Sequence, residues 1–251
     1  MNGTGDLSGR VAVVTGGGGG IGSAICEGLA GAGATVLVGY AGHPERARQL
    51  ASGLPGTGHR ALQIPVDDSG VLAQAAADVQ ATEGRLDLLV NNAGVTTPVP
   101  HADLDGLSDE WIDTILRVNV RGPFACVRAF APLLRSHADG LVVNISSVAA
   151  VTGLGSNVAY CASKAALDSM TRSLARALAP EIRVLSVSPG WVDGEYAARM
   201  PPELIAAQAA LTPLGRIARP QEVARAVLAA ATHLSFTTGA VIPVDGGRPL
   251  N

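Results

Sequence analysis

The sequence is poor in the features that mark several large classes of protein. Its three cysteines stand at unrelated spacings, so neither a disulfide framework nor a metal site is expected. No hydrophobic run reaches the roughly 20 residues that a membrane-spanning helix needs, so no membrane partner is expected. Residues 1–10 are polar and glycine-rich, unlike a signal peptide. The expected compartment is therefore the reducing cytoplasm.

Charge of one sign is also scarce. The formal net charge is −3, so no basic surface for nucleic acid is expected. Hydrophobic residues make up 47% of the chain and charged residues 16%, which is typical of a globular protein and not of a disordered one. Lysine is almost absent, because only one of the 18 Lys and Arg residues, Lys164, is a lysine. The surroundings of this one lysine are therefore informative.

Apolar segments and helical segments alternate along the chain. Strands are expected at Val11–Thr15, Thr35–Tyr40, Ala61–Val66, Leu86–Asn91, Leu141–Ser146, Ile182–Ser188 and Ala240–Val244. Helices are expected at about Ile21–Ala32, Pro44–Ser52, Val71–Glu83, Asp109–Arg135 (interrupted near Gly122-Pro123), Val158–Ala179 and Gln221–Thr232. Apolar strands that are each followed by a helix indicate a parallel sheet covered on both faces. We expect one α/β domain over residues 1–251.

One long connection has no clear pattern. Residues 191–219, called the lid segment below, include Pro201, Pro202 and Pro213 and are expected to be irregular. Connections of this length in compact domains are usually lids or binding loops. The larger apolar side chains of the segment either line an apolar substrate pocket or pack within the lid itself. They are Trp191, Tyr196, Met200, Leu204 and Leu211.

A glycine-rich segment follows the first expected strand. Residues 15–22 read Thr-Gly-Gly-Gly-Gly-Gly-Ile-Gly and precede an amphipathic helix. Glycines at such a place let the chain turn tightly and let the backbone approach a pyrophosphate at the helix N-terminus. A merely flexible loop is the alternative, but the position between strand and helix favours dinucleotide binding.

A second motif contains the only lysine. Tyr160 and Lys164 stand four residues apart in an expected helix and so share one face. A nearby ammonium lowers the pKa of a tyrosine, so the pair could exchange a proton with a carbonyl oxygen. The alternative is an ordinary surface pair. Ser147 ends a strand thirteen residues before Tyr160, where its hydroxyl either binds a substrate oxygen or caps a turn.

Together these residues resemble the short-chain dehydrogenase/reductase family, in its single-domain branch and over essentially the whole chain. The resemblance implies a Rossmann-type, doubly wound parallel sheet of about seven strands with helices on both faces, usually in a homotetramer. It implies a catalytic tetrad of Asn119, Ser147, Tyr160 and Lys164. In the family the tyrosine is the general acid/base and the lysine binds the nicotinamide ribose and lowers the tyrosine pKa. The serine orients the carbonyl, and the asparagine holds a water in a proton relay.

The resemblance also implies the nucleotide contacts. These are Gly16, Gly20, Ile21, Gly22, Tyr40, His43, Asp67, Asn91, Ala93, Gly94, Tyr160, Lys164, Pro189, Gly190 and Val192. Asp67 corresponds to the residue that bonds the adenine amino group. Gly194 stands where the family often has a threonine that bonds the carboxamide, so the backbone near Val192 is expected to take that role. Leu185 stands where the family often has an asparagine.

The choice between cofactors depends on the end of the second strand. NAD-dependent members usually place an acidic residue there, which binds the ribose 2′-hydroxyl. This chain has Tyr40 instead, with His43 and Arg46 as the basic candidates nearby. Nothing at this position repels a 2′-phosphate, so NADP(H) is favoured over NAD(H). The expected activity is that of a carbonyl reductase or alcohol dehydrogenase.

The substrate is open between small molecules and acyl groups on a carrier protein. Relatives similar to 3-oxoacyl-carrier-protein reductases tend to be basic at two places where this chain has Asp139 and Glu181. Because carrier proteins are acidic, these charges favour a free ketone or secondary alcohol, although Arg121, Arg128 and Arg135 form an alternative basic patch. A third alternative, a non-catalytic nucleotide-binding regulator, is disfavoured by the intact tetrad.

Overall fold

The computed structural model describes residues 6–137 and 139–250. Its centre is a seven-stranded sheet in the order β3-β2-β1-β4-β5-β6-β7, with every pairing parallel. The strands are β1 (Val11–Val14), β2 (Thr35–Tyr40), β3 (Arg60–Gln63), β4 (Leu88–Asn91), β5 (Gly140–Ile145), β6 (Ile182–Pro189) and β7 (Val241–Val244). The expected doubly wound α/β fold is therefore confirmed.

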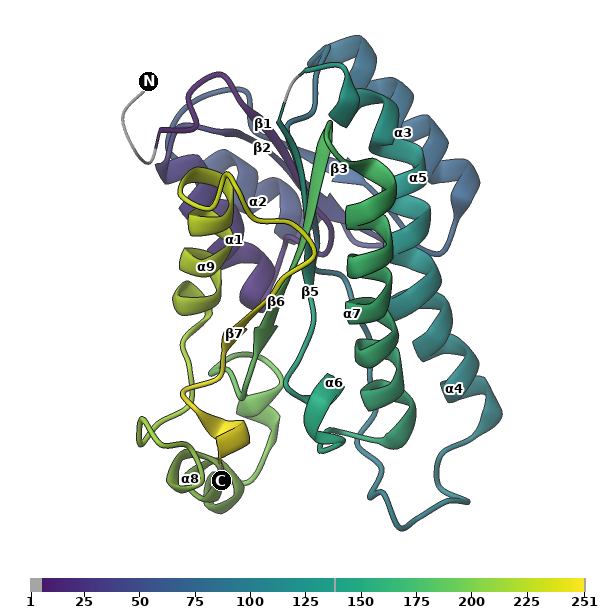
Figure 1. Ribbon diagram of the computed structural model, residues 1–251, viewed down its shortest axis with the longest axis vertical. Helices are drawn as coiled ribbons and strands as arrows, with labels where there is room; N and C mark the ends of the chain where they lie inside the picture. The colour runs from purple at the N-terminus through teal and green to yellow at the C-terminus, as the bar shows by residue number, and fades with distance from the viewer. Residues whose placement is uncertain (1–5, 138, 251) are drawn as a thin grey trace.

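Helices cover both faces of this sheet. They are α1 (Gly20–Gly31), α2 (Glu45–Gly53), α3 (Ser69–Thr82), α4 (Asp109–Leu116), α5 (Gly122–Arg135), α6 (Ala149–Thr152), α7 (Val158–Leu178), α8 (Pro202–Ala210) and α9 (Pro220–Thr232). Figure 1 shows α1, α2 and α9 on one face and α3, α4, α5 and α7 on the other. No helix among the described residues is long and apolar enough to cross a membrane.

Two apolar layers hold the helices on the sheet. Successive residues of a strand point to opposite faces, so Val14 packs in the layer with α1 and α9, and Val13 in the layer with α3 and α5. Ile25 of α1 and Phe130 of α5 are completely buried in these two layers. Burying one such side chain contributes about 1.5–3 kcal/mol. The strands are apolar throughout because both faces of the sheet are covered.

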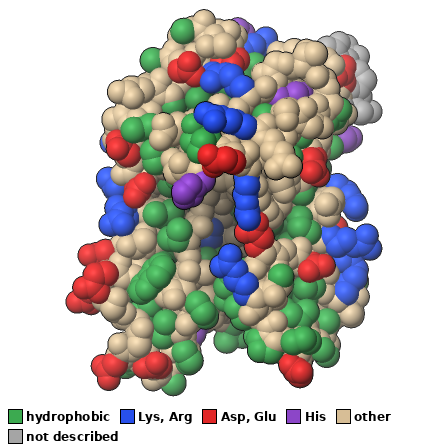
Figure 2. Space-filling model, turned by 180° about the vertical axis from the view of Figure 1, so that it is seen from behind, with side chains coloured by type: hydrophobic (Ala, Val, Ile, Leu, Met, Phe, Trp, Pro, Cys, Tyr) green, Lys and Arg blue, Asp and Glu red, His purple; other side chains and the backbone are tan. Residues whose placement is uncertain are grey.

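The order of the strands in the sheet indicates where a ligand would bind. It reverses between β1 and β4, and in sheets of this kind ligands bind beyond the carboxyl ends of the strands at that point. The backbone N–H of Thr15 donates to the carbonyl oxygen of Val90 at 3.0 Å, which joins the two strand ends there. The space-filling view shows a hollow in the lower half of the molecule, bordered by hydrophobic side chains and by charges of both signs (Figure 2).

The expected interruption of the helix before Arg135 has a different form in the structure. A π-helical turn, Arg117–Arg121, joins α4 to α5, and Gly122-Pro123 begins α5 without breaking it. A proline in the first turn of a helix is favourable, because its missing N–H has no helical partner there. Gly122 packs closely on the β3–α3 loop: a Cβ at this position would stand 2.8 Å from Cγ2 of Val66.

The prediction that the lid segment is irregular was wrong. It contains a 3-10 turn at Ala197–Arg199 and the helix α8, and Val192 pairs with Ala218 in a parallel bridge. The prolines indicated a loop, but Pro202 begins α8 at the one helical position that prolines favour. No residue of α8 is fully buried, and the helix lies at the carboxyl-end side of the sheet (Figure 1).

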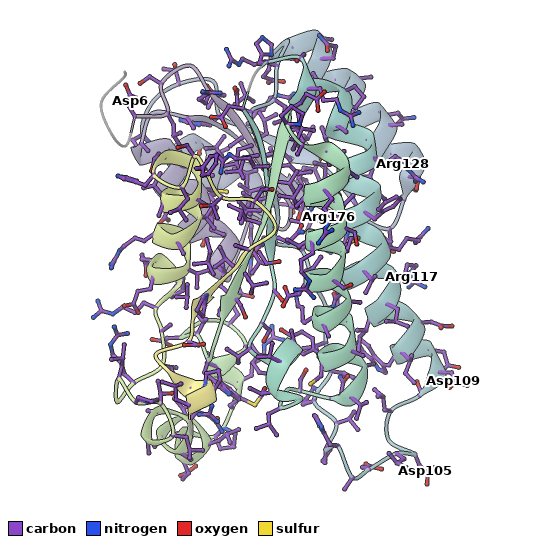
Figure 3. The ribbon with its side chains drawn as sticks, in the orientation of Figure 1. Asp6, Asp105, Asp109, Arg117, Arg128 and Arg176 are labelled. Atoms are coloured by element: carbon purple, nitrogen blue, oxygen red, sulfur yellow. The ribbon has the colours of Figure 1, made fainter. Side chains whose placement is uncertain are left out.

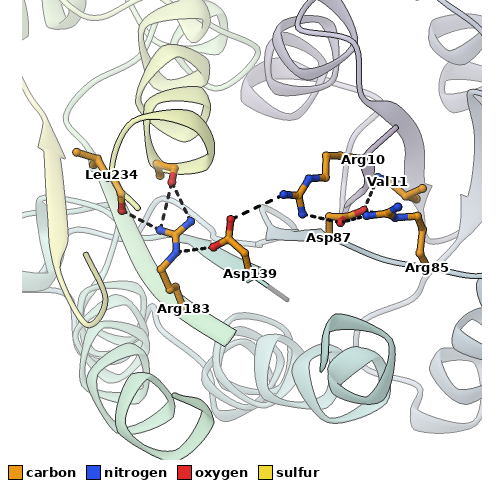
Figure 4. Close-up of polar contacts among 8 residues, drawn as sticks. Arg10, Val11, Arg85, Asp87, Asp139, Arg183 and Leu234 are labelled. Atoms are coloured by element: carbon orange, nitrogen blue, oxygen red, sulfur yellow. Dashed lines mark hydrogen bonds and ion pairs between the residues drawn. The ribbon is translucent and has the colours of Figure 1, made fainter. Parts of the chain in front are cut away.

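A charged network closes the opposite, amino-end edge of the sheet. Asp87 binds Arg85 and Arg10 at 2.6 and 2.9 Å, and Asp139 binds Arg183 at 3.2 Å (Figure 4). Arg183 also donates to the carbonyl oxygen of Leu234 at 3.0 Å. Since Asp139 precedes β5 and Ser147 follows it, this network lies at the other end of the strand from the expected tetrad.

Candidate active site

Helix α7 carries the tyrosine and the lysine. It begins after Asn157, whose side-chain oxygen accepts a hydrogen bond from the backbone N–H of Tyr160 at 2.7 Å. Lys164 lies one turn further along and is buried, with Nζ 5.7 Å from the centre of the Tyr160 ring. The ammonium donates to the carbonyl oxygen of Ile145 at 2.8 Å. The lysine is thereby fixed between α7 and the end of β5.

Ser147 completes this group from the turn after β5. Its hydroxyl hydrogen-bonds the phenol of Tyr160, and it also accepts from the backbone N–H of Ala149 at 3.2 Å. The same serine therefore caps the turn that leads into the short helix α6 and faces the tyrosine. The turn-capping role expected for Ser147 is confirmed, and its binding of a substrate oxygen stays a prediction.

The two titratable groups are tuned mainly by burial. Burial raises the pKa of Tyr160, and the hydrogen bond from Ser147 works in the opposite direction. Burial also lowers the pKa of Lys164 to about 8, while the carboxylate of Asp168 raises it. The lowering of the tyrosine pKa by Lys164 stays a prediction, and the net shift of that pKa is upward. The reason is that the cost of desolvating a phenolate exceeds the favourable contributions there.

Asn119 lies in the π turn and is almost completely buried. Its amide nitrogen donates to the carbonyl oxygen of Val95 at 3.0 Å and to Oγ of Ser163 at 3.2 Å. Its amide oxygen accepts from the backbone N–H of Val95 at 2.8 Å. A Cβ on Gly94 would stand 3.3 Å from Oδ1 of Asn119 and 3.7 Å from Nζ of Lys164. All four residues of the expected tetrad are therefore brought into one cluster.

The glycine loop is held by residues that sequence reasoning missed. The amide nitrogen of Asn92 donates to the carbonyl oxygens of Thr15 and Gly16, at 3.0 Å each. Oγ1 of Thr15 accepts from the backbone N–H groups of Asn92 and Ala93, also at 3.0 Å. The threonine that opens the glycine run and the second asparagine of the Asn-Asn-Ala-Gly segment were the signals that could have found this contact.

This loop fits a dinucleotide. A Cβ on Gly22 would stand 2.3 Å from the carbonyl oxygen of Gly16, so only glycine allows α1 to begin this close to the loop. No side chain caps the N-terminus of α1, and its first turn contains no acidic residue. The first turn of α1 therefore offers backbone N–H groups to an anion, as in helices that bind a pyrophosphate. Gly20 and Ile21 form the first turn of that helix.

The adenosine-side residues surround the ends of β2 and β3. Tyr40 ends β2, and His43 is exposed in the loop that follows it. Asp67 follows β3, where its carboxylate pairs with Nε of Arg117 at 3.4 Å and its backbone oxygen accepts from Arg121 at 2.7 Å. Figure 3 shows Arg117 on the outer side of the joined α4–α5 helix. The π turn thus contains Asn119 and also contacts Asp67, the residue that is expected to bind the adenine.

The remaining expected contacts lie at the ends of β4 and β6. Asn91 is buried behind the site and donates to Oδ1 of Asn144 at 2.9 Å, so it ties β4 to β5. Pro189 ends β6 and Gly190 follows it, where a Cβ would stand 3.1 Å from Cα of Asp245. Val192 comes next, at the bridge that begins the lid segment.

Comparisons with known proteins agree with this arrangement. A family model described as enoyl-(acyl carrier protein) reductase matches residues 16–248. The fold matches a putative short-chain dehydrogenase/reductase from Burkholderia xenovorans with a TM-score of 0.90, at 33% identity over 98% of this chain and 100% of that one. The chain belongs to the short-chain dehydrogenase/reductase family.

Two relatives in this family show the range of named activities. The chain is 37% identical over 243 residues to a cis-4-hydroxycyclohexanecarboxylate dehydrogenase from Sinomonas cyclohexanicum, covering 95% of this chain and 96% of the relative. It is 34% identical over 245 residues to a 3-oxoacyl-acyl-carrier-protein reductase from Thermotoga maritima, covering 96% and 98%. The enzyme is accordingly an NAD(P)(H)-using oxidoreductase that acts on CH–OH or C=O groups.

Proposed function

We propose that this enzyme is an NADP(H)-dependent carbonyl reductase or alcohol dehydrogenase acting on a ketone or secondary alcohol. The observation that carries the proposal is the convergence of Ser147, Tyr160 and Lys164 at the carboxyl end of β5. We further propose that residues 1–251 form one dinucleotide-binding domain, with residues 191–219 as the substrate lid, working in the cytoplasm. The aromatic pair Trp191 and Tyr196, with ring centres 5.9 Å apart, would form an apolar wall of the substrate pocket.

Residues of the chain would carry out the proton transfer that accompanies the hydride transfer. The nicotinamide, when bound, supplies or accepts the hydride. The Ser147 hydroxyl would hold the substrate oxygen, and Tyr160 would donate its proton to that oxygen during reduction. Burial keeps Tyr160 protonated, as a general acid requires. Lys164 would bind the nicotinamide ribose and support tyrosinate after proton transfer, and Asn119 would hold the relay water.

The residues that would hold the dinucleotide follow the crevice from end to end. Gly16, Gly20, Ile21 and Gly22 would bind the pyrophosphate at the start of α1. The adenosine side would contact Tyr40, His43 and Asp67. Ala93 and Gly94, in the loop after β4, would support the ribose, with Asn91 buried behind them. The nicotinamide would contact Pro189, Gly190 and Val192, together with Tyr160 and Lys164.

Two features support NADP(H) over NAD(H). Tyr40 leaves the end of β2 without the carboxylate that would repel a 2′-phosphate. Arg46, in the first turn of α2, extends to the glycine loop: its Nη1 lies 3.8 Å from the point where a Cβ on Gly19 would stand. The guanidinium therefore brings a positive charge to the loop from a neighbouring helix, and a guanidinium binds phosphate well.

A homotetramer is part of the proposal. Trp111, Leu116 and Phe124 along the joined α4–α5 helix expose 42%, 40% and 44% of their surface. Large apolar side chains exposed on an outer helix favour contact with another subunit. Light scattering at several protein concentrations would test the assembly, and a monomer at all of them would contradict it.

Reduction of a carrier-bound 3-oxoacyl group is the second candidate. The charge of Asp139, which argued against an acidic carrier, is paired with Arg183 at 3.2 Å and lies at the edge of the sheet away from Ser147. Repulsion by Asp139 is therefore weaker than expected. The test compares kcat/KM for a 3-oxoacyl group on its carrier and on a short thioester mimic. A carrier advantage that disappears at high salt would favour this candidate.

The direct test of the proposed function follows NADPH oxidation by the purified protein with a panel of ketones and β-keto esters. We expect turnover with at least some of the panel and a higher kcat/KM with NADPH than with NADH. A protein that binds NADPH yet reduces none of these compounds, in free or carrier-bound form, would contradict the proposal and favour a regulatory role.

A further inference from the structure

An ion pair joins the lid segment to the glycine loop. Nη1 of Arg46, on α2, lies 2.7 Å from Oε1 of Glu195, in the lid segment. The carboxylate oxygen lies 3.2 Å from the point where a Cβ on Gly19 would stand. The pair therefore lies on the glycine loop, in space that a side chain at position 19 would fill.

The position of this pair matters because it lies where the polyanionic part of a dinucleotide would bind. Gly19 precedes α1, whose uncapped N-terminus favours a negative charge. Arg46 is the proposed partner of a 2′-phosphate, but in this structure its guanidinium binds Glu195. The two side chains are 71% and 53% exposed, and an ion pair this exposed is weak and readily exchanged. A phosphate binds a guanidinium more strongly, through two charge-assisted hydrogen bonds.

We propose that Glu195 is a specificity-determining residue for the nucleotide. When a 2′-phosphate binds Arg46, it replaces Glu195 as the partner of the guanidinium. The ion pair between the lid segment and α2 is then broken. A 2′-hydroxyl does not compete for the guanidinium, so the ion pair between Arg46 and Glu195 stays in place. Glu195 thus weakens the binding of NADP(H) relative to NAD(H) and makes the lid respond to the 2′-phosphate. The inference rests on the proposed NADP(H) function, and on Arg46 in particular.

The binding test uses two nucleotides that differ only in the 2′-phosphate, 2′,5′-ADP and 5′-AMP. Glu195→Gln removes the charge and keeps the size of the side chain. We expect it to tighten 2′,5′-ADP about three- to fivefold and to leave 5′-AMP almost unchanged, as measured by titration calorimetry. Glu203→Gln, which removes another exposed charge from the lid segment, is the matched control and should change neither affinity.

Variants of Arg46 separate the two proposals. Arg46→Gln should weaken 2′,5′-ADP about tenfold, and adding Glu195→Gln to that variant should then give no further gain. If Arg46→Gln leaves the affinity for 2′,5′-ADP unchanged, the proposed role of Arg46 fails and the inference fails with it. If Arg46→Gln weakens binding but Glu195→Gln has no effect, or has the same effect whether or not Arg46 is present, the inference alone fails.

Release of the lid segment has its own readout. The chain has two tryptophans, of which Trp191 lies in the lid segment and Trp111 on α4. In a Trp111→Phe variant, the fluorescence of Trp191 should change when 2′,5′-ADP binds and not when 5′-AMP binds. Glu195→Gln should abolish this difference. Equal changes with both nucleotides would contradict coupling of the lid to the 2′-phosphate.

Discussion

The ammonium of Lys164 lies 2.8 Å from the carbonyl oxygen of Ile145, so the one lysine of the chain is fixed to the strand that leads to Ser147. Lys164→Arg keeps the charge, but the larger planar guanidinium does not fit the buried space. We expect turnover to fall at least tenfold and the cofactor to bind more weakly, with the circular dichroism spectrum unchanged. Normal turnover and normal cofactor affinity would show that Lys164 is only a structural charge.

The pKa of Lys164 determines how the activity should depend on pH. Burial lowers the pKa of Lys164 to about 8, so its ammonium is present below that pH and is lost above it. For ketone reduction, kcat/KM should therefore fall as the pH rises through about 8. Asp168 raises this pKa, so Asp168→Asn should move the fall to lower pH. Asp193→Asn, in the lid segment, is the control, and an identical shift in both variants would contradict the assignment.

Two glycines of α1 form a matched pair. A Cβ at Gly22 would stand 2.3 Å from the carbonyl oxygen of Gly16, whereas a Cβ at Gly31 meets nothing within 4 Å. Gly22→Ala should displace the glycine loop and weaken cofactor binding at least tenfold, as followed by NADPH fluorescence. Gly31→Ala should leave binding unchanged and stabilise the protein by about 0.5–1 kcal/mol in urea unfolding. Equal cofactor affinities in the two variants would exclude a close approach at Gly22.

Cofactor preference is tested at the end of β2. Tyr40→Asp would place a carboxylate where it repels a 2′-phosphate and accepts from a 2′-hydroxyl. We expect the ratio of kcat/KM for NADPH to that for NADH to fall at least tenfold, which corresponds to about 1.4 kcal/mol. Tyr40→Phe is the control and should keep the wild-type ratio. A wild type that already prefers NADH would show that the missing acid at this position is not a sufficient signal.

The sheet could be predicted because each strand is apolar on both faces, as in Val11–Val14, and because each is followed by a helical period. Tyr160 and Lys164 could be placed on one face of α7 from their four-residue spacing, whereas the grouping with Asn119 and Ser147 came from the resemblance to the family. The lid segment could not be predicted, because Pro202 is compatible both with a loop and with the first position of a helix. The π turn around Asn119 was missed for a similar reason, since it continues the helical period on both sides.

Contacts between distant segments were beyond sequence reasoning. Arg46 and Glu195 are 149 residues apart, and nothing in either neighbourhood indicates the other. The upward pKa shift of Tyr160 was also missed, because burial of a phenol depends on packing that only the fold reveals. Asp139 gives a third case: its pairing with Arg183 weakens the repulsion that had counted against an acidic partner.

Tyr160 is proposed to donate the proton in NADPH-dependent ketone reduction. The most direct measurement compares kcat for the best ketone, and the Kd for NADPH, between the wild type and Tyr160→Phe. Since this change removes only the hydroxyl, kcat should fall about 100- to 10,000-fold while the Kd stays within about twofold. Tyr196→Phe, which alters the neighbouring phenol of the lid segment, should retain most of its turnover. A Tyr160→Phe enzyme that keeps more than about a third of the wild-type kcat would show that Tyr160 is not the proton donor.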